Sequence, residues 1–215
     1  MKNTTILLIR HGETAWNAMR RLQGHIDIPL NEEGLRQADA LAQALANVPL
    51  TAVIASDLQR AMQTAQAVGG LHGLAVQTDE LLRERCYGVF EGMMYDEISQ
   101  RYPAEYALWQ ARDVDAVMPP GERVAESFRQ FYQRSVDAIA HWAGRYPGQT
   151  IAMVAHGGVL ECAFRAGTGR SLDSPRDFEV RNASINRFTF AEGKLTLENW
   201  GETEHLRLAT LDDIT

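Results

Sequence analysis

The chain has 215 residues, of which 45% are hydrophobic and 23% charged, and its formal net charge is −7. This size and composition are typical of one globular domain spanning residues 1–215, with a core large enough to need no disulfide or metal. The negative charge argues against a nucleic-acid partner, which usually requires a basic patch, and the apolar run at residues 6–9 is too short for a membrane span or a secretory signal.

The cysteine content indicates a reducing compartment. Cys86 and Cys162 are the two cysteines of the chain, too few for a disulfide framework. Since we also expect no membrane partner and no secretory signal, the sequence predicts a reduced, cytoplasmic protein.

Short apolar runs alternate with helical patterns along the chain, which is typical of an α/β fold. The first run, residues 5–9, is continuous and predicts a strand buried on both faces. A helix is expected after Asn31, because Glu32 and Glu33 suit a helix N-terminus and apolar residues then recur at helical spacing. Those apolar residues are Leu35, Ala38, Leu41, Ala42 and Leu45.

A second apolar run over residues 51–55 predicts another buried strand. Ser56 is expected to cap the helix that follows, with Asp57 in the first helical position. The buried stripe of this helix is expected to consist of Leu58, Ala61, Met62 and Ala65.

Residues 93–120 interrupt the alternation with a weaker pattern. Their aromatic residues predict short helices broken at Pro103, which we interpret as a small helical cap inserted over an edge of the sheet. A long helix over residues 128–142 is expected next, and it ends before Pro147. A third apolar strand is expected over residues 150–155.

The C-terminal part completes the predicted fold. His156 is followed by two glycines that open another helix, and residues 184–190 and 194–200 alternate around Gly193, which predicts a hairpin. The polar tail from Gly201 is expected to be irregular. Together the elements predict a three-layer α/β/α sandwich with a mostly parallel central sheet and the small helical cap insertion.

Three predicted strands end in residues suited to binding an anion. The first ends at Arg10 and His11, the second lies just before Arg60, and the third ends at His156 and Gly157. Ligands of open α/β sheets bind beyond the carboxyl ends of the strands, and a helical side chain tilts back toward the helix N-terminus, so Arg60 can reach that edge. The helix beginning at Gly157 adds unpaired N–H groups. This combination suits a phosphoryl group.

Each of these residues also has an ordinary structural explanation. Taken alone, Arg10 and His11 are typical of a protein surface. Arg60 is typical of a solvated helix face, and His156 of a histidine buried in a core. The prediction of a phosphoryl site therefore depends on the coincidence of three strand ends.

Several short segments carry a resemblance to a known family. They are Arg10-His11-Gly12-Glu13-Thr14 with Trp16-Asn17, the run from Arg21 to Leu30, Ser56-Asp57-Leu58-Gln59-Arg60-Ala61, Glu84-Arg85-Cys86-Tyr87-Gly88 with Glu91-Gly92, and Ala155-His156-Gly157-Gly158. In this order the segments resemble the signature of the histidine phosphatase superfamily, also called the phosphoglycerate mutase-like family. The resemblance extends over most of the chain.

The resemblance implies a role for each matching residue. His11 would take the phosphoryl group on a ring nitrogen, while Arg10, Arg60 and His156 would hold that group. Glu84 would protonate the leaving oxygen and then activate water. Further substrate contacts are expected from Asn17, Gln23, Gly24 and the backbone of Gly157. No metal and no cofactor are implied, and the partner would be a small-molecule phosphate ester.

The chemistry of a histidine nucleophile agrees with these roles. Such a histidine must be neutral, and Arg10 and Arg60 should lower the pKa of His11. A backbone carbonyl is expected to hold the second ring nitrogen and so fix the tautomer. Glu84 could instead form a salt bridge with a neighbouring arginine, either Arg83 or Arg85.

Other reactive residues are not expected to take part. Cys86 lies beside Glu84, but the Cys-x5-Arg phosphate loop of cysteine phosphatases is absent. The remaining histidines lack the spacing of metal ligands and are interpreted as surface or packing residues. They are His25, His72, His141 and His205.

The resemblance covers both phosphatases and cofactor-dependent mutases. The mutases show a lysine after the glutamate segment and paired arginines after a tryptophan, where this chain has Tyr95 and Gln110-Ala111. Nearby acidic residues, namely Asp96, Glu97, Glu105, Asp113 and Asp115, argue against a highly anionic leaving group. We therefore expect a phosphatase that hydrolyses small-molecule phosphomonoesters through a phosphohistidine on His11.

Two alternatives remain beside that expectation. One is a phosphoglycerate mutase, an isomerase, and the other is a regulator that binds a phosphorylated ligand without catalysis. The cap aromatics are expected either to contact the leaving group or only to pack the cap onto the sheet. The oligomeric state is left open, with a homodimer among the options.

Overall fold

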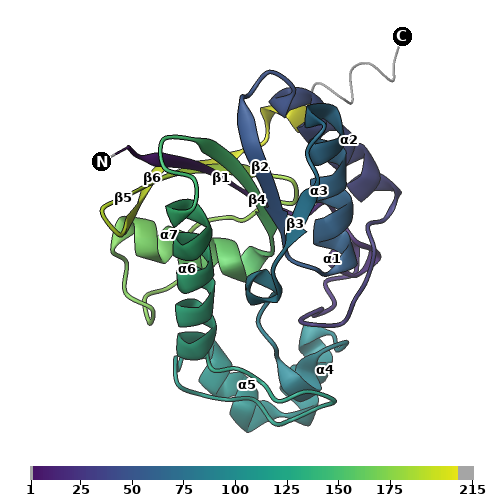
Figure 1. The fold of residues 1–215 in the computed structure, drawn as a ribbon. Coiled ribbons are helices and arrows are strands. Elements are labelled where there is room, and N and C mark those ends of the chain that lie inside the picture. Colours follow the sequence, from purple (N-terminus) through teal and green to yellow (C-terminus); the bar gives the residue numbers. More distant parts are fainter. Residues whose placement is uncertain (1, 208–215) are drawn as a thin grey trace.

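The computed structural model describes residues 2–207, and it contains a six-stranded sheet in the order β3-β2-β4-β1-β5-β6 (Figure 1). The strands are β1 (Thr4–Arg10), β2 (Leu50–Ala55), β3 (Val76–Thr78), β4 (Thr150–Ala155), β5 (Ile185–Ala191) and β6 (Lys194–Glu202). The first four are mutually parallel, whereas β5 pairs antiparallel with β1 and β6 antiparallel with β5. The predicted mostly parallel sheet is confirmed.

Helices cover both faces of this sheet, as the three-layer prediction requires. Helices α2 (Glu32–Leu45) and α3 (Gln59–His72) pack on one face, and α6 (Phe128–Gly144) and α7 (Gly157–Thr168) pack on the other. Strand β1 supplies both cores, because Ile6 and Leu8 point to the α6–α7 side and Leu7 and Ile9 to the α2–α3 side. All four are fully buried.

The start of α3 differs from the prediction. This helix begins at Gln59 with Leu58 as its N-cap residue, so Ser56 is not the cap. Asp57 stays outside the helix because its carboxylate pairs with the Arg83 guanidinium. Ser56 Oγ accepts only a long bond, 3.4 Å, from the Leu58 N–H.

Helix α2 begins as predicted, and four of its five predicted apolar residues are buried. The Asn31 side chain caps it by accepting the Gly34 N–H. Gly34 faces the sheet, where an added Cβ would lie 2.0 Å from the Glu13 carbonyl oxygen. Leu35 therefore turns outward and is 48% exposed, although it belongs to the predicted apolar periodicity.

The cap consists of α4 (Tyr95–Arg101) and α5 (Pro103–Gln110), and Pro103 occupies the first turn of α5. A separate apolar cluster holds it, formed by Leu22, Phe90, Ile98, Met118 and Ala125. The edge of the sheet that the cap covers is the one formed by the carboxyl ends of the parallel strands. The cap lies at the bottom of Figure 1 and lines the same cavity as Arg10 and His11.

Several shorter elements lie between these helices and strands, including two 3-10 helices, η1 (Glu80–Leu82) and η2 (Gly88–Phe90). Helix α1 (Ala15–Ala18) follows β1, and the predicted hairpin is confirmed as β5 and β6, whose turn residues Glu192 and Gly193 both have positive φ. Gly201 still belongs to β6, so the tail is not irregular there. Its end, from residue 208, lies outside the described residues. No helix within residues 2–207 has the length and apolar character needed to cross a membrane.

Candidate active site

The carboxyl ends of β1, β4 and β2 lie side by side, because these three strands are neighbours in the sheet. Arg10 is in register with Ala155, so the residues that follow each strand come together. The rings of His11 and His156 have their centroids 5.2 Å apart. The predicted meeting of three strand ends is thus present in the structure.

His11 is 3% exposed and its ring is held in one tautomer. Its Nδ1–H donates to the Gly12 carbonyl oxygen at 2.7 Å, which leaves the lone pair of Nε2 available. Burial lowers the pKa of His11 well below its usual value, and the charges of Arg60 and Arg10 lower it further. The predicted direction is confirmed, although burial is the larger cause.

Arg10 turns its guanidinium toward the start of α7. Its Nη1 donates to the Val180 carbonyl at 2.6 Å, while its buried Nε has no hydrogen-bond partner among the described residues. A Cβ added to Gly157 would lie 3.5 Å from that Nε. Burial lowers the pKa of Arg10 to about 10, so the group stays cationic at neutral pH. An unpaired donor of this kind suits an anion.

Arg60 is buried and bound on every side. It donates to the carbonyls of Gly24 and Ile26 at 2.8 and 3.0 Å and, through Nε, to His156 Nδ1 at 3.2 Å. Because a guanidinium only donates, His156 must accept at Nδ1 and carry its proton on Nε2. That Nε2 is buried without a partner in the described chain, and His156 itself does not line the cavity.

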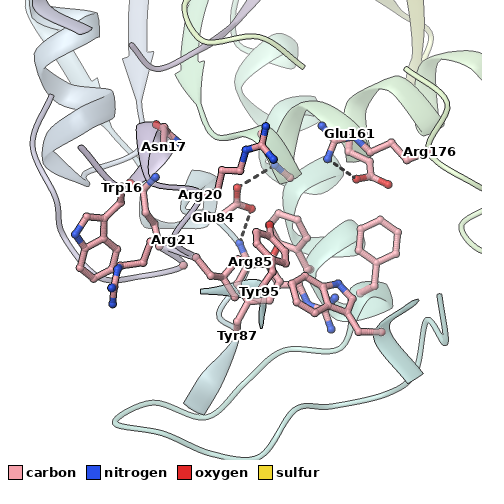
Figure 2. Close-up of a pocket in the computed structure, with 18 of the residues that line it drawn as sticks. Trp16, Asn17, Arg20, Arg21, Glu84, Arg85, Tyr87, Tyr95, Glu161 and Arg176 are labelled. Atoms are coloured by element: carbon pink, nitrogen blue, oxygen red, sulfur yellow. Dashed lines mark hydrogen bonds and ion pairs between the residues drawn. The ribbon is translucent and has the colours of Figure 1, made fainter. Parts of the chain in front are cut away.

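Glu84 is held by backbone N–H groups rather than by an arginine. Its carboxylate accepts from the Arg85 N–H at 2.8 Å and from the Gly158 N–H at 3.0 Å (Figure 2). The Arg83 side chain pairs with Asp57, and the Arg85 guanidinium donates to the backbone carbonyls of Glu126 and Ala116. The salt-bridge alternative for Glu84 is therefore wrong.

The other predicted contact residues also border the cavity. Asn17 Oδ1 accepts from both the N–H and the hydroxyl of Thr14 at 3.1 Å, so the Asn17 amide nitrogen remains free to donate. Gln23 is buried with an unpartnered Oε1 within the described residues. Gly24 has a φ of +55°, and a Cβ there would collide with the Glu91 carboxylate.

These residues border a cavity of about 420 Å³, and its lining contains more arginines than the sequence motifs indicate. Its lining includes seven arginines and three carboxylates. The arginines are Arg10, Arg20, Arg21, Arg60, Arg85, Arg112 and Arg176, and the carboxylates are Glu84, Asp113 and Glu161. The nearby acidic residues argue against a highly anionic leaving group only if these additional arginines are left out of account.

Arg112 and Arg176 both pair with Glu161 on the cavity wall. Figure 2 labels Arg176 and Glu161. Arg112 Nη2 lies 2.5 Å from one Glu161 oxygen, and Arg176 Nη1 lies 3.5 Å from the other. Fully buried Arg165 also pairs with this carboxylate, at 2.9 Å. Three guanidinium groups thus share one carboxylate, which leaves a surplus of positive charge on this wall.

Sequence reasoning missed Arg112 and Arg176 because they come from separate loops after α5 and α7, and no motif marks them. Of the acidic residues expected nearby, Asp113 lines the cavity, whereas Asp115 pairs with Arg129 and Glu97 binds the backbone of Met94.

Aromatic side chains form an apolar part of the same cavity. Tyr95 and Trp109 of the cap stack with centroids 5.7 Å apart, and both line the cavity. Trp109 also packs against Phe90 of the cap cluster. Tyr95 and Trp109 therefore pack within the cap and also line the cavity, and their contact with a leaving group stays a prediction.

Cys86 and the remaining histidines stay outside this chemistry. Burial raises the pKa of Cys86 to about 11, so its thiol is protonated at neutral pH. His25 Nε2 lies 2.7 Å from the Glu84 carbonyl, where it steadies the backbone. Between residues 2 and 207, no cluster of three or more His, Cys, Asp and Glu side chains could hold a metal ion.

The chain is similar in sequence to known proteins. The sequence profile of the histidine phosphatase superfamily (branch 1) matches residues 6–203. Phosphoglycerate mutase-like protein 4 of Arabidopsis thaliana is 37% identical over 205 residues, covering 94% of this chain and 86% of that protein.

Two solved structures have the same fold. YhfR of Bacillus stearothermophilus is 34% identical with a TM-score of 0.86, over 94% of this chain and 99% of that one. Phosphoserine phosphatase of Entamoeba histolytica, solved with 3-phosphoglyceric acid, is 27% identical with a TM-score of 0.82, over the same shares of each chain. From the profile match and these relatives, the chain belongs to the histidine phosphatase superfamily (branch 1).

Proposed function

We propose that this protein hydrolyses small-molecule phosphomonoesters through a phosphohistidine on His11. The observation that carries the proposal is the state of the His11 ring. It is neutral and bound at Nδ1, and it borders a cavity that also contains the Arg10 guanidinium. A nucleophile at Nε2 needs both conditions, a free lone pair and positive charge beside the phosphoryl group.

The first step transfers the phosphoryl group to the protein. His11 Nε2 attacks phosphorus, the bond from phosphorus to the ester oxygen breaks, and Glu84 gives a proton to the departing alcohol. The Glu84 carboxylate accepts hydrogen bonds from the Arg85 and Gly158 N–H groups, which orient it toward the cavity as a general acid and base.

The second step releases phosphate. Glu84, now a carboxylate, takes a proton from a water molecule as its oxygen attacks phosphorus, and the bond to His11 Nε2 breaks. The lone pair returns to Nε2, so His11 is ready for another turn. The steps balance without a metal ion or a cofactor.

Donors suited to the phosphoryl oxygens surround this position. They are Arg10 Nε, the Asn17 amide nitrogen and the N–H of Gly157, which as the first residue of α7 has no intrahelical acceptor. Arg60 contributes charge from within the protein, and His156 Nε2 is a further candidate donor. Gln23 and Gly24 shape the border of this subsite.

The natural substrate is proposed to carry a second anionic group. Arg112 and Arg176 line the cavity with more positive charge than Glu161 neutralises, and a carboxylate suits a pair of guanidinium groups. The structurally similar protein from Entamoeba histolytica, named phosphoserine phosphatase and solved with 3-phosphoglyceric acid, supports this class of substrate.

A phosphoglycerate mutase is the second candidate. The name of the Arabidopsis thaliana relative favours it, and so does the arginine-rich lining, since a mutase must bind its carboxylated substrate between transfers. The two functions differ in the fate of the phosphoryl group, which goes to water in one case and back to the glycerate in the other.

Phosphate release and mutase turnover measured on one protein sample will separate these functions. We expect release from O-phosphoserine and from p-nitrophenyl phosphate in the presence of a chelator, together with an acid-labile phosphoenzyme that His11→Ala abolishes. Full turnover by His11→Ala would reject the mechanism. Interconversion of phosphoglycerates much faster than any hydrolysis would make the mutase the correct function.

A further inference from the structure

Asn182 lies outside the cavity, in the segment between α7 and β5, and its side chain reaches three oxygens of the candidate site. Its Nδ2 donates to the carbonyls of His11 and Gly12 at 3.0 and 3.2 Å and to Asn17 Oδ1 at 3.3 Å. One amide therefore connects the backbone of the nucleophile with a phosphate-contacting side chain.

The orientation of both amides follows from chemistry. Backbone carbonyls only accept hydrogen bonds, so the nitrogen of Asn182 must face His11 and Gly12. Asn17 Oδ1 receives the Thr14 N–H, which only donates, so the oxygen of Asn17 must face Thr14. The contact between the two asparagines then joins a donor to an acceptor.

The contact with Asn17 determines what that residue offers a ligand. Its Oδ1 accepts from Thr14 and from Asn182, so the amide cannot flip without losing these bonds. The Nδ2 group of Asn17 is consequently the part left to donate to an anion.

The contact with Gly12 acts on the nucleophile. The Gly12 carbonyl that accepts from Asn182 is the same oxygen that accepts His11 Nδ1–H at 2.7 Å. On its other side, the Gly12 N–H donates to Thr64 Oγ1 at 3.0 Å. The peptide groups around Gly12 are thus fixed from two directions, and the direction of the His11 ring follows from that of the carbonyl.

The segment that carries Asn182 is itself attached to β1. The Ala183 N–H donates to the Arg10 carbonyl at 3.0 Å, and the Val180 carbonyl accepts the Arg10 side chain at 2.6 Å. Ala183 is fully buried with a φ of +53°, a conformation that a residue other than glycine keeps only when its surroundings hold it. Asn182 therefore lies in a segment that hydrogen bonds to Arg10 hold in place.

We infer that Asn182 is a positioning residue, which fixes the His11 tautomer through Gly12 and aims the Asn17 amide at the phosphoryl group. The inference rests on the proposed function for its kinetic consequence. No sequence motif pointed to Asn182, because it acts through backbone oxygens and touches no substrate.

The test compares Asn182→Asp and Asn182→Ala with Asn47→Asp, an isosteric change at an exposed residue after α2. The aspartate variant keeps the shape of the side chain but replaces the donor with an acceptor that faces three oxygens. We expect the single-turnover rate of His11 phosphorylation to fall about 10- to 100-fold in both variants, as for a small misplacement of a reacting group. Asn47→Asp should keep the wild-type rate.

Two further readouts separate positioning from a general loss of structure. Nitrogen NMR of the histidines should give His11 of the wild type protonated at Nδ1, with a second population protonated at Nε2 in Asn182→Asp. In a double-mutant cycle with Asn17→Ala, the rate losses should be less than additive, because Asn182 acts partly through Asn17.

Wild-type rates in both Asn182 variants would overturn the inference. So would a loss of rate with an unchanged tautomer and additive effects, or a failure of both variants to fold, since each would leave Asn182 a structural role only. The NMR measurement needs no turnover, so it still tests Asn182 if the wild-type protein forms no phosphohistidine and the proposed function fails.

Discussion

Gly158→Ala should disable Glu84 without changing any reacting group. A Cβ at Gly158 would lie 2.1 Å from Glu84 Oε1 and 2.8 and 2.9 Å from two carbon atoms of the Phe131 ring, whereas ordinary contacts begin near 3.4 Å. The Glu84 carboxylate must move, and the two short contacts with the buried Phe131 ring also require a smaller shift between the start of α7 and that ring. The carboxylate must retreat by about 1 Å or more, and such a misplacement of a reacting group costs about 100-fold in rate.

The size of this loss in rate depends on the leaving group of the substrate. An alkyl phosphate needs a proton on its departing oxygen, so we expect kcat/KM for such a substrate to fall about 100-fold or more, within the range of general acid catalysis. p-Nitrophenolate leaves without a proton, so its ester should lose much less in the first step. Measuring both esters by phosphate release, with single-turnover kinetics for the first step, gives the comparison.

Gly70→Ala is the matched control. Gly70 lies in α3 with nothing within 4 Å of its added Cβ, so this substitution should leave kcat/KM unchanged and stabilise the helix by about 0.5–1 kcal/mol. Equal losses on both esters in Gly158→Ala would refute the reasoning, because a displaced general acid must discriminate between leaving groups. An unchanged rate would refute it as well.

The other predictions concern stability and specificity. Folding lowers the pKa of His11 and His156, so below about pH 6.5 the unfolded chain binds more protons than the folded protein. The free energy of unfolding should therefore decrease as the pH is lowered through this range, by up to about 1.4 kcal/mol per pH unit for each histidine. Urea titrations measure this change. Thr64→Val should cost about 1–3 kcal/mol by leaving the Gly12 N–H buried and unpaired. Arg112→Gln and Arg176→Gln should each lower kcat/KM about 10-fold for a carboxylated phosphate ester and leave p-nitrophenyl phosphate unaffected.

A specific result would contradict each of these predictions. A pH slope that His11→Ala does not reduce would exclude His11 as its source. Thr64→Ser keeps the acceptor and loses only a buried methyl group, so it should cost less than Thr64→Val, and an equal loss in both Thr64 variants would point to packing instead. Arg129→Gln, which breaks only an exposed pair with Asp115, should preserve kcat/KM, and equal effects in all three arginine variants would indicate long-range charge.

The sheet and the meeting of its strand ends could be predicted because both depend on local, repeated patterns. Continuous apolar runs identify β1, β2 and β4, and parallel strands must bring Arg10, His11 and His156 to one edge. The errors arose where a tertiary contact outweighed a local preference. Ser56 is a good capping residue, but the pairing of Asp57 with Arg83 delays the helix.

The charge of the cavity could not be predicted for a related reason. Arg112 and Arg176 are 64 positions apart in the numbering, on loops with no periodicity, and only the folded chain joins them at Glu161. Arg112 has a φ of +57°, which nothing in its sequence neighbourhood indicates. Of the five acidic residues expected beside them, Asp113 lines the cavity, whereas Glu97 and Asp115 are bound elsewhere.

The residues proposed to act on the phosphoryl group and those that orient them therefore differ in how they can be found. The proposed roles of His11, Arg60 and Glu84 each require a particular side chain, and a motif records such a requirement. Their orientation depends on backbone groups, such as the Gly12 carbonyl and the Gly158 N–H, which any sequence supplies. A substitution of Asn182 or Gly158 consequently disturbs the chemistry through atoms that sequence motifs do not describe, and those two positions test the site more sharply than another replacement of His11.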